Sequence, residues 1–317
     1  MKESLYFDLV AFGKSSVDFT YVVESSNQKN GKAPIFEENI SGGGQAANTA
    51  IATSLLGGRS AYVGNIGWDE LGLLLLKEFR KFGVNCQWVE RPHNFNTPKA
   101  VVLVDRDSGS RKIFYQNRQE NFACPLPAEV VKNTKVLILD PDISEEDIDK
   151  VKKWKSTETV VIYDAERFRL SLNPMKKFAD FFIASESILD IDPDLNRKEA
   201  ISSLNKDVRG ELIITFGERG SVWWKDKKFP IHIPANFVKN VRDTTGAGDV
   251  FHAAFGYFFP KLKDIILTLK YATYCAGVST TFLGTRKPIN YHEGLSDAVK
   301  SLRDIELHEL PDWMLYR

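Results

Sequence analysis

Short apolar runs alternate with amphipathic stretches along most of the chain. The runs are rich in Val, Ile, Leu and Phe, and their length is typical of buried strands. The stretches between them repeat their apolar residues at helical spacing, which predicts amphipathic helices. Strands that alternate with helices need crossover connections, and these build a mostly parallel sheet covered by helices on both faces. The pattern therefore predicts the α/β class, with strands at residues 5–12, 60–63, 136–139, 159–163, 181–184 and 212–215 and helices at 70–82, 145–155 and 195–205.

Two stretches interrupt this alternation and predict a small β-lid. Residues 17–23 form a strand-like run that is followed by a polar loop through Asn30-Gly31. Residues 99–104 and 111–116 flank a turn-forming segment, 105–110, in the manner of a hairpin. We expect both stretches to cover one end of the main sheet, as lid segments at about 14–40 and 95–121. Because no repeat or linker divides the chain, we predict a single domain over residues 1–317, with a mainly helical last third.

Composition narrows the class of protein. Of the 317 residues, 43% are apolar, which is enough for a large buried core, and 42 basic residues balance 42 acidic ones. A neutral balance argues against nucleic-acid binding by whole-protein charge, because affinity for phosphate backbones comes from surplus Lys and Arg. No run approaches the roughly 18 apolar residues of a membrane span, and acidic residues near the N-terminus argue against a signal peptide. With three scattered cysteines (Cys86, Cys124 and Cys275), we expect a soluble cytoplasmic protein with no membrane partner.

The most informative segment is a glycine-rich turn before a helix, Asp-Thr-Thr-Gly-Ala-Gly-Asp at residues 243–249. Apolar or small side chains follow Asp249 nearly all round, so we predict a buried helix that begins at Gly248-Asp249 and ends at Pro260. The free N–H groups of Gly246, Ala247 and Gly248 would point at one spot, where the helix dipole adds positive charge. Such a turn is suited to binding phosphate.

The Asp that opens this helix has two possible roles. It could simply cap the helix, which is a common role for Asp. Alternatively, the Asp249 carboxylate could accept a hydroxyl proton while the amide turn holds a transferring phosphoryl group. We favour the second role, because a carboxylate beside an anion-binding turn is electrostatically unfavourable unless it takes part in chemistry.

The segment 243–251 resembles the C-terminal signature of the PfkB (ribokinase-like) carbohydrate kinases, which phosphorylate sugars or nucleosides with ATP. Three other segments resemble motifs of this family in the same order. Residues 41–50 (SGGGQAANTA) are similar to Gly-Gly-x-x-x-Asn, residues 64–72 (GNIGWDELG) to Gly-x-x-Gly-x-Asp-x-x-Gly, and residues 215–220 (TFGERG) to Thr-x-Gly-x-x-Gly. The resemblance extends from the first strand to about Pro288 and implies a three-layer α/β/α ribokinase-like core with a β-lid.

The resemblance also implies a role for individual residues. Asp249 would be the catalytic base, with Gly246, Ala247 and Gly248 as the anion hole. Asp18, Gly43, Gly44 and Asn48 would bind the acceptor sugar. Thr215, Gly217 and Gly220 would support the nucleotide phosphates, and Gly277 would belong to the wall beside the adenine. Alone, Asp18 could equally be a solvated loop residue, the Gly-rich turn of residues 41–44 could be an ordinary turn, and Gly277 could serve helix packing.

The chain departs from the family pattern in two places. The usual Asn-x-x-Glu motif, which positions Mg²⁺ through water, is absent, and Glu186 is the only acid of that stretch and our candidate for the metal shell. Together with the triple glycine, this resembles a branch that includes sulfofructose kinase and ketohexokinase-like proteins. Gln45 stands where many relatives have Lys, which argues against a phosphorylated acceptor. Four arginines could meet an anionic substituent or simply lie at the surface: Arg111, Arg118, Arg167 and Arg169.

These observations leave one leading function and two alternatives. The leading one is an ATP-dependent sugar kinase that uses ATP and Mg²⁺. The alternatives are a nucleoside kinase of the same fold and a non-catalytic sugar-binding regulatory member. The resemblance further suggests a monovalent cation such as K⁺, bound by carbonyl groups near Asp243 and residues 282–284. Because lid strands leave unpaired edges, we also expect a homodimer that forms through the lid.

Overall fold

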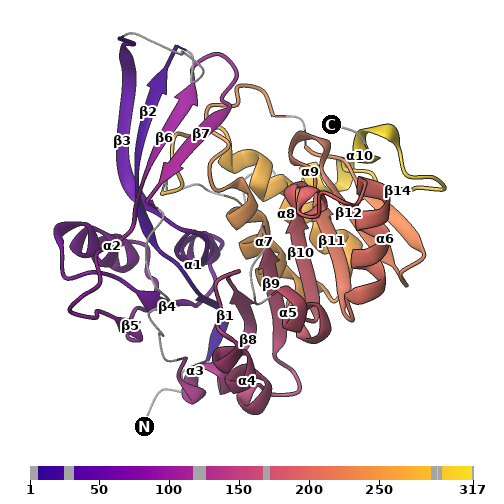
Figure 1. Cartoon of the computed structure of the whole chain (residues 1–317), viewed down its shortest axis with the longest axis horizontal. Helices are drawn as coiled ribbons and strands as arrows, with labels where there is room; N and C mark the ends of the chain where they lie inside the picture. The colour runs from indigo at the N-terminus through magenta and orange to yellow at the C-terminus, as the bar shows by residue number, and fades with distance from the viewer. Residues whose placement is uncertain are drawn as a thin grey trace.

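A ten-stranded sheet forms the middle layer of the computed structural model (Figure 1). The structure describes residues 6–24, 32–116, 126–166, 172–236, 238–286, 291 and 295–315. The strand order is β14-β13-β12-β11-β10-β9-β8-β1-β4-β5. The strands are β1 (Phe7–Phe12), β4 (Ser60–Asn65), β5 (Val89–Glu90), β8 (Thr134–Leu139), β9 (Val160–Ala165), β10 (Phe181–Ser185), β11 (Glu211–Thr215), β12 (Ser221–Lys225), β13 (Phe229–Ile233) and β14 (Ile305–Glu306).

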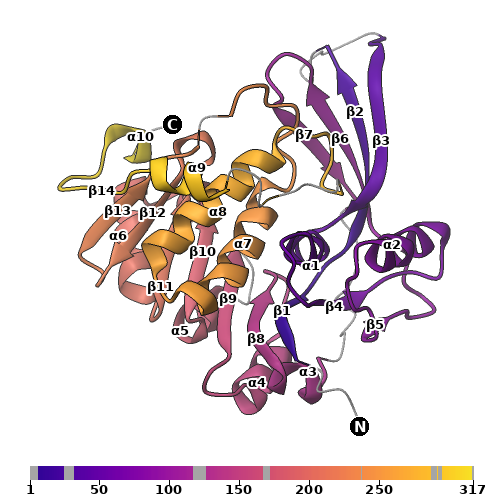
Figure 2. The same ribbon diagram turned by 180° about the vertical axis from the view of Figure 1, so that it is seen from behind.

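The sheet is parallel from β5 to β11 and antiparallel from β11 to β14. A separate cluster of buried apolar residues lies on each face, so helices cover both faces (Figure 2). One face carries α1 (Gln45–Leu55), α2 (Glu70–Lys81), α7 (Ala247–Leu262), α8 (Ile265–Ser279) and α9 (Leu295–Ser301). The other carries α3 (Ala128–Lys132), α4 (Glu145–Trp154), α5 (Leu172–Phe178), α6 (Arg197–Asp207) and α10 (Asp312–Leu315). This arrangement confirms the predicted three-layer α/β/α fold.

A second, four-stranded sheet stands out from the core as the lid, in the order β3-β2-β6-β7 (Figures 1 and 2). Its strands are β2 (Ser16–Val23), β3 (Ile35–Gly43), β6 (Lys99–Asp105) and β7 (Arg111–Tyr115). β2 pairs antiparallel with β3 and parallel with β6, and β6 pairs antiparallel with β7. Val102 and Val104 of the lid pack with Leu283, which ties this sheet to the C-terminal part of the core.

The register of the lid strands places Asp18 and Thr20 on one face of the lid and a row of apolar side chains on the other. Directly paired residues share a face, whereas successive residues along a strand alternate between faces. Asp18 therefore shares its face with Thr20 and with their partners Ala100 and Val102 on β6, and Val102 packs toward the core. The opposite face carries an apolar row that crosses all four strands, formed by Ile40, Phe19, Val101 and Phe114.

Most expected elements are present, with four differences. α7 includes Pro260 and continues to Leu262, so the predicted end at Pro260 was wrong. A proline in the last turn removes one hydrogen bond of the helix, and here the helix tolerates that loss. The helix also begins one residue earlier than expected, at Ala247. Finally, β12 and β13 lie in the last third, which was predicted to be mainly helical, and β3 begins in the predicted lid segment 14–40 at a place where no strand was predicted.

The buried face of α7 should dominate stability. Phe255 is fully buried, and its ring lies 4.9 Å from that of Phe181 and 5.8 Å from that of Phe259, between centroids. Phe255→Ala should lower the free energy of unfolding by about 3–5 kcal/mol, because it removes buried apolar surface and leaves a cavity. Phe229→Ala, at a half-exposed position on β13, should change it by less than about 0.5 kcal/mol. Urea denaturation followed by circular dichroism measures both, and equal losses would contradict this packing account.

Candidate functional site

The glycine-rich turn forms the N-terminus of α7, as the sequence predicts. Gly246 is the N-cap with φ of 73°, a left-handed value that favours glycine, and no side chain caps the helix. A Cβ on Gly246 would lie only 2.3 Å from Cγ2 of Thr285. The Ala247 N–H makes one long contact, 3.4 Å to the carbonyl oxygen of Thr244. At Gly248, by contrast, a Cβ would meet nothing within 4 Å, so the space in front of the turn is open.

Asp249 lies in the first turn of α7, beside these amides. Its carboxylate accepts a hydrogen bond of 2.5 Å from the Asn48 side-chain amide, and Thr49 Oγ1 donates to its main-chain oxygen at 3.4 Å. Burial, together with the negative charge of Asp164, raises the pKa of the Asp249 carboxyl to about 8, although the Asn48 hydrogen bond opposes that rise. A carboxyl group with this pKa can exchange a proton near neutral pH.

Behind Asp249 lies a buried polar cluster at the carboxyl end of β9. Asp164 accepts a hydrogen bond from Gln45 at 3.2 Å, and its Oδ1 lies 3.6 Å from Nε2 of His252. His252 Nδ1 lies 2.8 Å from the Gly248 carbonyl oxygen, one turn back along the helix. Burial lowers the pKa of His252, which favours the neutral ring. Both ring nitrogens of His252 face oxygen acceptors, and a neutral ring can donate its single N–H to only one of them, of which the Gly248 carbonyl oxygen is the nearer.

The predicted acceptor residues meet at the junction of the lid and α1. A Cβ on Gly43 would collide with the Asp18 carboxylate, and one on Gly44, whose φ is 90°, would lie 2.6 Å from Cα of Ser15. Burial raises the pKa of Asp18, although a hydrogen bond from Ser16 opposes this. Asn48 is only 5% exposed and uses its amide on Asp249, while its oxygen accepts from Thr285 at 3.0 Å. Asn48 therefore joins the predicted acceptor residues to Asp249.

A buried ion pair lies behind this junction, and the sequence motifs give no sign of it. Arg286 is 7% exposed, and its Nε lies 3.3 Å from Oε2 of Glu78 on α2. The same Glu78 oxygen accepts the Gly42 N–H at 2.9 Å. Arg286 also donates to the carbonyl oxygens of Ala47, at 3.2 Å, and Gly43, at 3.4 Å. A cation thus lies beside the predicted acceptor residues, although Gln45 replaces the usual Lys.

The predicted nucleotide residues form a second turn at the end of β11. Gly217 and Gly220 have φ of 56° and 92°, so both need glycine-like freedom. A Cβ on Gly217 would meet nothing within 4 Å, which leaves open space above the turn, whereas one on Gly220 would collide with the Ile233 carbonyl oxygen. Thr215 donates to the Ala184 carbonyl oxygen at 3.2 Å. Gly277 lies on α8, where a Cβ would be 3.1 Å from Val238.

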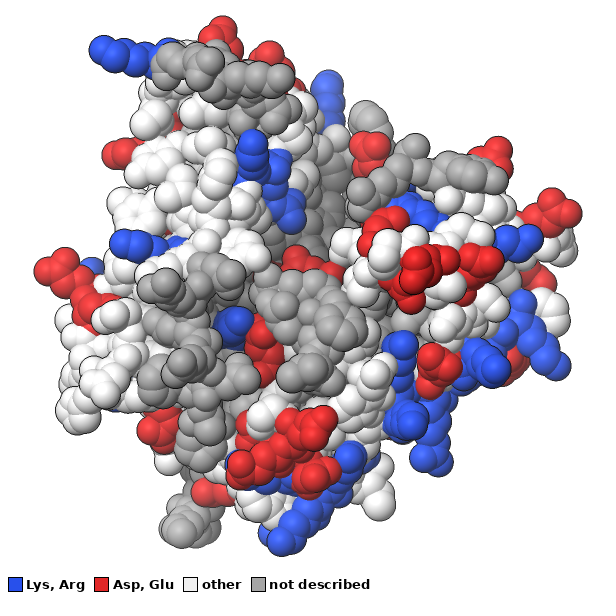
Figure 3. Space-filling view, viewed as in Figure 1, with Lys and Arg blue, Asp and Glu red and all other residues white. Residues whose placement is uncertain are grey.

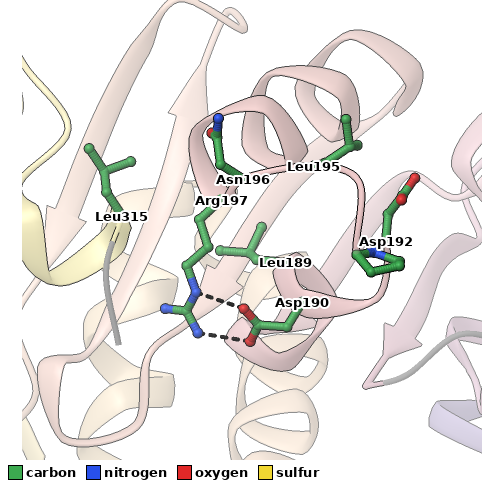
Figure 4. A pocket seen from close by; sticks show the side chains of 8 residues that line it. Leu189, Asp190, Asp192, Leu195, Asn196, Arg197 and Leu315 are labelled. Carbon is green, nitrogen blue, oxygen red and sulfur yellow. Dashed lines mark hydrogen bonds and ion pairs between the residues drawn. The ribbon is translucent and has the colours of Figure 1, made fainter.

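The predicted metal-shell residue makes two ion pairs. Oε2 of Glu186 accepts from Arg219 at 2.8 Å and from Arg197 at 3.2 Å, and Arg197 also makes a bidentate pair with Asp190, shown in Figure 4. Arg219 belongs to the turn that is predicted to bind the nucleotide, so Glu186 connects that turn to the segment after β10. A pocket of about 520 Å³ opens beside Arg197, and none of the predicted site residues lines it. In the described part of the chain, no group of three or more His, Cys, Asp or Glu side chains could hold a metal ion by itself.

The two segments suggested for a monovalent cation lie together. The Asp243 carboxylate accepts the N–H groups of Thr245, at 2.8 Å, and Gly284, at 2.9 Å. The lid reaches the same signature: Arg111 Nη1 donates to both oxygens of Thr244 at 2.7 Å. Arg118, Arg167, Arg169 and Cys124 lie outside the described residues. Among the helices that the structure describes, none has the length and apolar character needed to cross a membrane.

Comparisons with known proteins show which family and which fold this chain resembles. The family model described as pfkB family carbohydrate kinase matches residues 7–290. A probable fructokinase-5 of Arabidopsis thaliana is 31% identical over 306 residues, which cover 87% of this chain and 92% of that protein. A deoxyribokinase of Salmonella typhi is 27% identical over 295 residues, which cover 88% of this chain and 94% of the relative.

Solved structures show the same fold. A putative ribokinase from Agrobacterium tumefaciens superposes with a TM-score of 0.82 at 20% identity, covering 92% of this chain and 97% of the other. The Arabidopsis thaliana ribokinase complexed with ribose and ATP superposes with a TM-score of 0.73 at 21% identity, covering 93% and 99%. A match over most of the chain, the shared fold and the paired glycine turns lead to one conclusion: the protein belongs to the PfkB family of carbohydrate kinases.

Proposed function

We propose that the protein transfers the γ-phosphoryl group of ATP to a hydroxyl group of a small sugar, with Asp249 as the general base. One observation carries this proposal: the carboxylate of Asp249 lies at the open amide turn of α7 and is joined through Asn48 to the predicted acceptor residues. A binding protein without catalysis has no need for a base at that position. The family membership and the named kinases among the relatives support the same reaction class.

The chemistry follows from the charges that develop during transfer. Asp249 accepts the hydroxyl proton as the acceptor oxygen attacks the γ-phosphorus, and its raised pKa suits a base that works near neutral pH. The N–H groups of Gly246, Ala247 and Gly248 stabilise the phosphoryl oxygens, which the helix dipole favours. The protein thus contributes position and electrostatic stabilisation, which are the main needs of phosphoryl transfer.

The acceptor would lie against Asp18, Gly43, Gly44 and the Asn48 region. Short polar side chains and open glycine amides provide both acceptors and donors for sugar hydroxyls. The relatives are named a fructokinase and a deoxyribokinase, and a similar structure holds ribose and ATP. D-fructose, D-ribose and 2-deoxy-D-ribose are therefore the first acceptors to assay.

ATP would use the second glycine turn, with Thr215, Gly217 and Gly220 at its phosphates and Gly277 on the adenine side. Mg²⁺ bound with the nucleotide would neutralise phosphate charge. Asp164 and Glu166, whose negative charges act on Asp249, supply an electrostatic environment that fits a divalent cation. Glu186 would contribute through water and in competition with Arg197 and Arg219. A monovalent ion such as K⁺ would lie beside Asp243 and residues 282–284.

The lid also supports a homodimer. Its face away from Asp18 carries the apolar row Ile40, Phe19, Val101 and Phe114, and Phe114 is 52% exposed. Much of the lid surface in Figure 3 is uncharged. Exposed apolar surface of this kind is typical of protein–protein contacts. We propose that a second copy of the chain covers this face.

Asp249→Asn should lower kcat by about 10²–10⁴-fold, because the amide cannot accept the proton. The KM for ATP should stay nearly unchanged, because Asn has the same shape as Asp and residue 249 is not among the residues proposed to bind ATP. Initial rates with ATP, Mg²⁺ and each of the three sugars measure this. Turnover close to wild type would rule out Asp249 as the base.

The pH profile provides an independent check on the same residue. The base must be ionised to act, so kcat/KM for the acceptor should fall as the pH decreases below about 8, the pKa of Asp249 in the free protein. The residual activity of Asp249→Asn should lack this acidic limb. An identical limb in both proteins would assign it to another group.

Gly248→Val should reduce transfer by about 10²–10³-fold while the protein remains folded. The new side chain has room, because nothing lies within 4 Å, but it would occupy the space in front of the amides. Gly246→Val is the contrasting variant: it collides with Thr285 and should lower the melting temperature as well. If Gly248→Val transfers phosphoryl groups as well as wild type, the amides are not the anion hole.

Phe114→Glu should convert the proposed dimer to a monomer, because it places a charge within the apolar row of the lid. Phe229→Glu, at a similarly exposed position on β13, should leave the dimer intact. Analytical ultracentrifugation at matched concentrations measures both. A monomeric wild type, or a dimer that survives Phe114→Glu, would exclude this interface.

A further inference from the structure

We propose that Arg286, paired with Glu78, is a positioning residue that holds the acceptor turn, residues 42–47, in its binding geometry. The inference rests on the proposed function for the identity of this turn as the acceptor site. No sequence motif singles out either residue. Their placement is a property of the fold, because α2 and the segment after α8 meet behind the turn.

The contacts hold the turn at several points. Glu78 accepts the Gly42 N–H at 2.9 Å, on the entry side. Arg286 donates to the carbonyl oxygen of Gly43, next to Gly42, and to that of Ala47, at the far end of the turn, and its Nε pairs with the same Glu78 oxygen. The glycine at position 42 is needed for this packing, since a Cβ there would lie 2.4 Å from the Glu78 carboxylate.

Thr285, the residue before Arg286, connects the same segment to Asp249 through Asn48. Thr285 donates at 3.0 Å to Asn48, whose amide binds Asp249. Gly284 in turn donates its N–H to Asp243 at 2.9 Å. Three consecutive residues, 284–286, thus connect the α7 signature, the base and the acceptor turn, although they lie far from the turn in sequence.

Charge gives the guanidinium a second effect on this site. Burial raises the pKa of both Asp18 and Glu78, and the positive charge of Arg286 opposes that rise in each. The guanidinium therefore helps to keep Asp18 ionised as a hydrogen-bond acceptor for a sugar hydroxyl. Arg286 is buried and enclosed by Glu78 and the carbonyl oxygens of the turn, so its guanidinium is not available to bind an anionic acceptor. Its proposed role is to hold the turn and to keep Asp18 ionised.

Arg286→Gln and Glu78→Gln test the inference, with Arg80→Gln on the exposed side of α2 as the matched control. The acceptor is whichever of D-fructose, D-ribose and 2-deoxy-D-ribose the wild type phosphorylates best. We expect the acceptor KM to rise about tenfold or more in both variants, with the KM for ATP within about twofold of wild type. Hydrogen exchange of the ligand-free protein should be faster in residues 41–50 and unchanged in residues 217–220. The control should match the wild type in every measurement.

Several results would overturn the inference. One is an unchanged acceptor KM together with unchanged exchange in residues 41–50. A second is that both single variants raise the KM for the acceptor and the KM for ATP equally and lower the melting temperature, and that all three quantities return to wild-type values in the Glu78→Gln/Arg286→Gln double variant. The pair would then serve general stability alone. If the wild type phosphorylates none of the three sugars, the proposed acceptor class fails, and the exchange measurement still decides whether the pair holds the turn.

Discussion

The site depends on one constraint: a carboxylate must stay close to an amide turn that attracts anions, inside a largely desolvated environment. Burial raises the pKa of Asp249 to about 8, and the neighbouring charge of Asp164 adds to the effect. The hydrogen bond from Asn48 works in the opposite direction and fixes the carboxylate in place. The buried helix α7 holds this arrangement, because its apolar residues pack between α1, α8 and the sheet. The packing of the core and the position of Asp249 are therefore coupled.

Around that constraint, segments distant in sequence converge. β3 and α1 provide the proposed acceptor turn, α7 provides Asp249 and the amides, and residues 284–286 bind both. The lid contacts the α7 signature through Arg111 and Thr244 as well. A small movement of the lid would shift Thr244 and with it the amide turn, because Arg111 contacts Thr244 directly. Closure over a sugar would also exclude water, which otherwise competes as a phosphoryl acceptor.

Much of the fold could be predicted from the sequence, because the central strands are short apolar runs separated by amphipathic helices. β3 was missed because its residues 35–40 are mostly exposed and show no buried face. It is an edge strand of the lid and, among the described strands, pairs only with β2. β12 and β13, which form a hairpin directly after β11, were missed because the last third of the chain was predicted to be mainly helical. The glycine turns were found through their motifs, and their φ angles explain the glycines at positions 44, 217, 220 and 246.

Other parts of the site had no sequence signal. Arg286 and Glu78 are single residues on separate elements, and only the folded arrangement makes them a pair. Asp164 lies near the end of β9, and no motif in the neighbouring sequence marks it as a site residue. Glu186 stood out as an isolated acid, yet its two arginine partners come from segments that the local sequence could not relate to it.

During the proposed transfer, a sugar hydroxyl lies against the Asp249 carboxylate while the amides of residues 246–248 hold the phosphoryl group. A crystal structure with D-fructose, ADP, Mg²⁺ and aluminium fluoride, a mimic of the transferring phosphoryl group, would test this arrangement most directly. The account predicts one sugar oxygen within about 3 Å of the Asp249 carboxylate. It also predicts the fluoride group against the N–H groups of Gly246, Ala247 and Gly248. A sugar bound away from Asp249, or fluoride held elsewhere than at this turn, would contradict it.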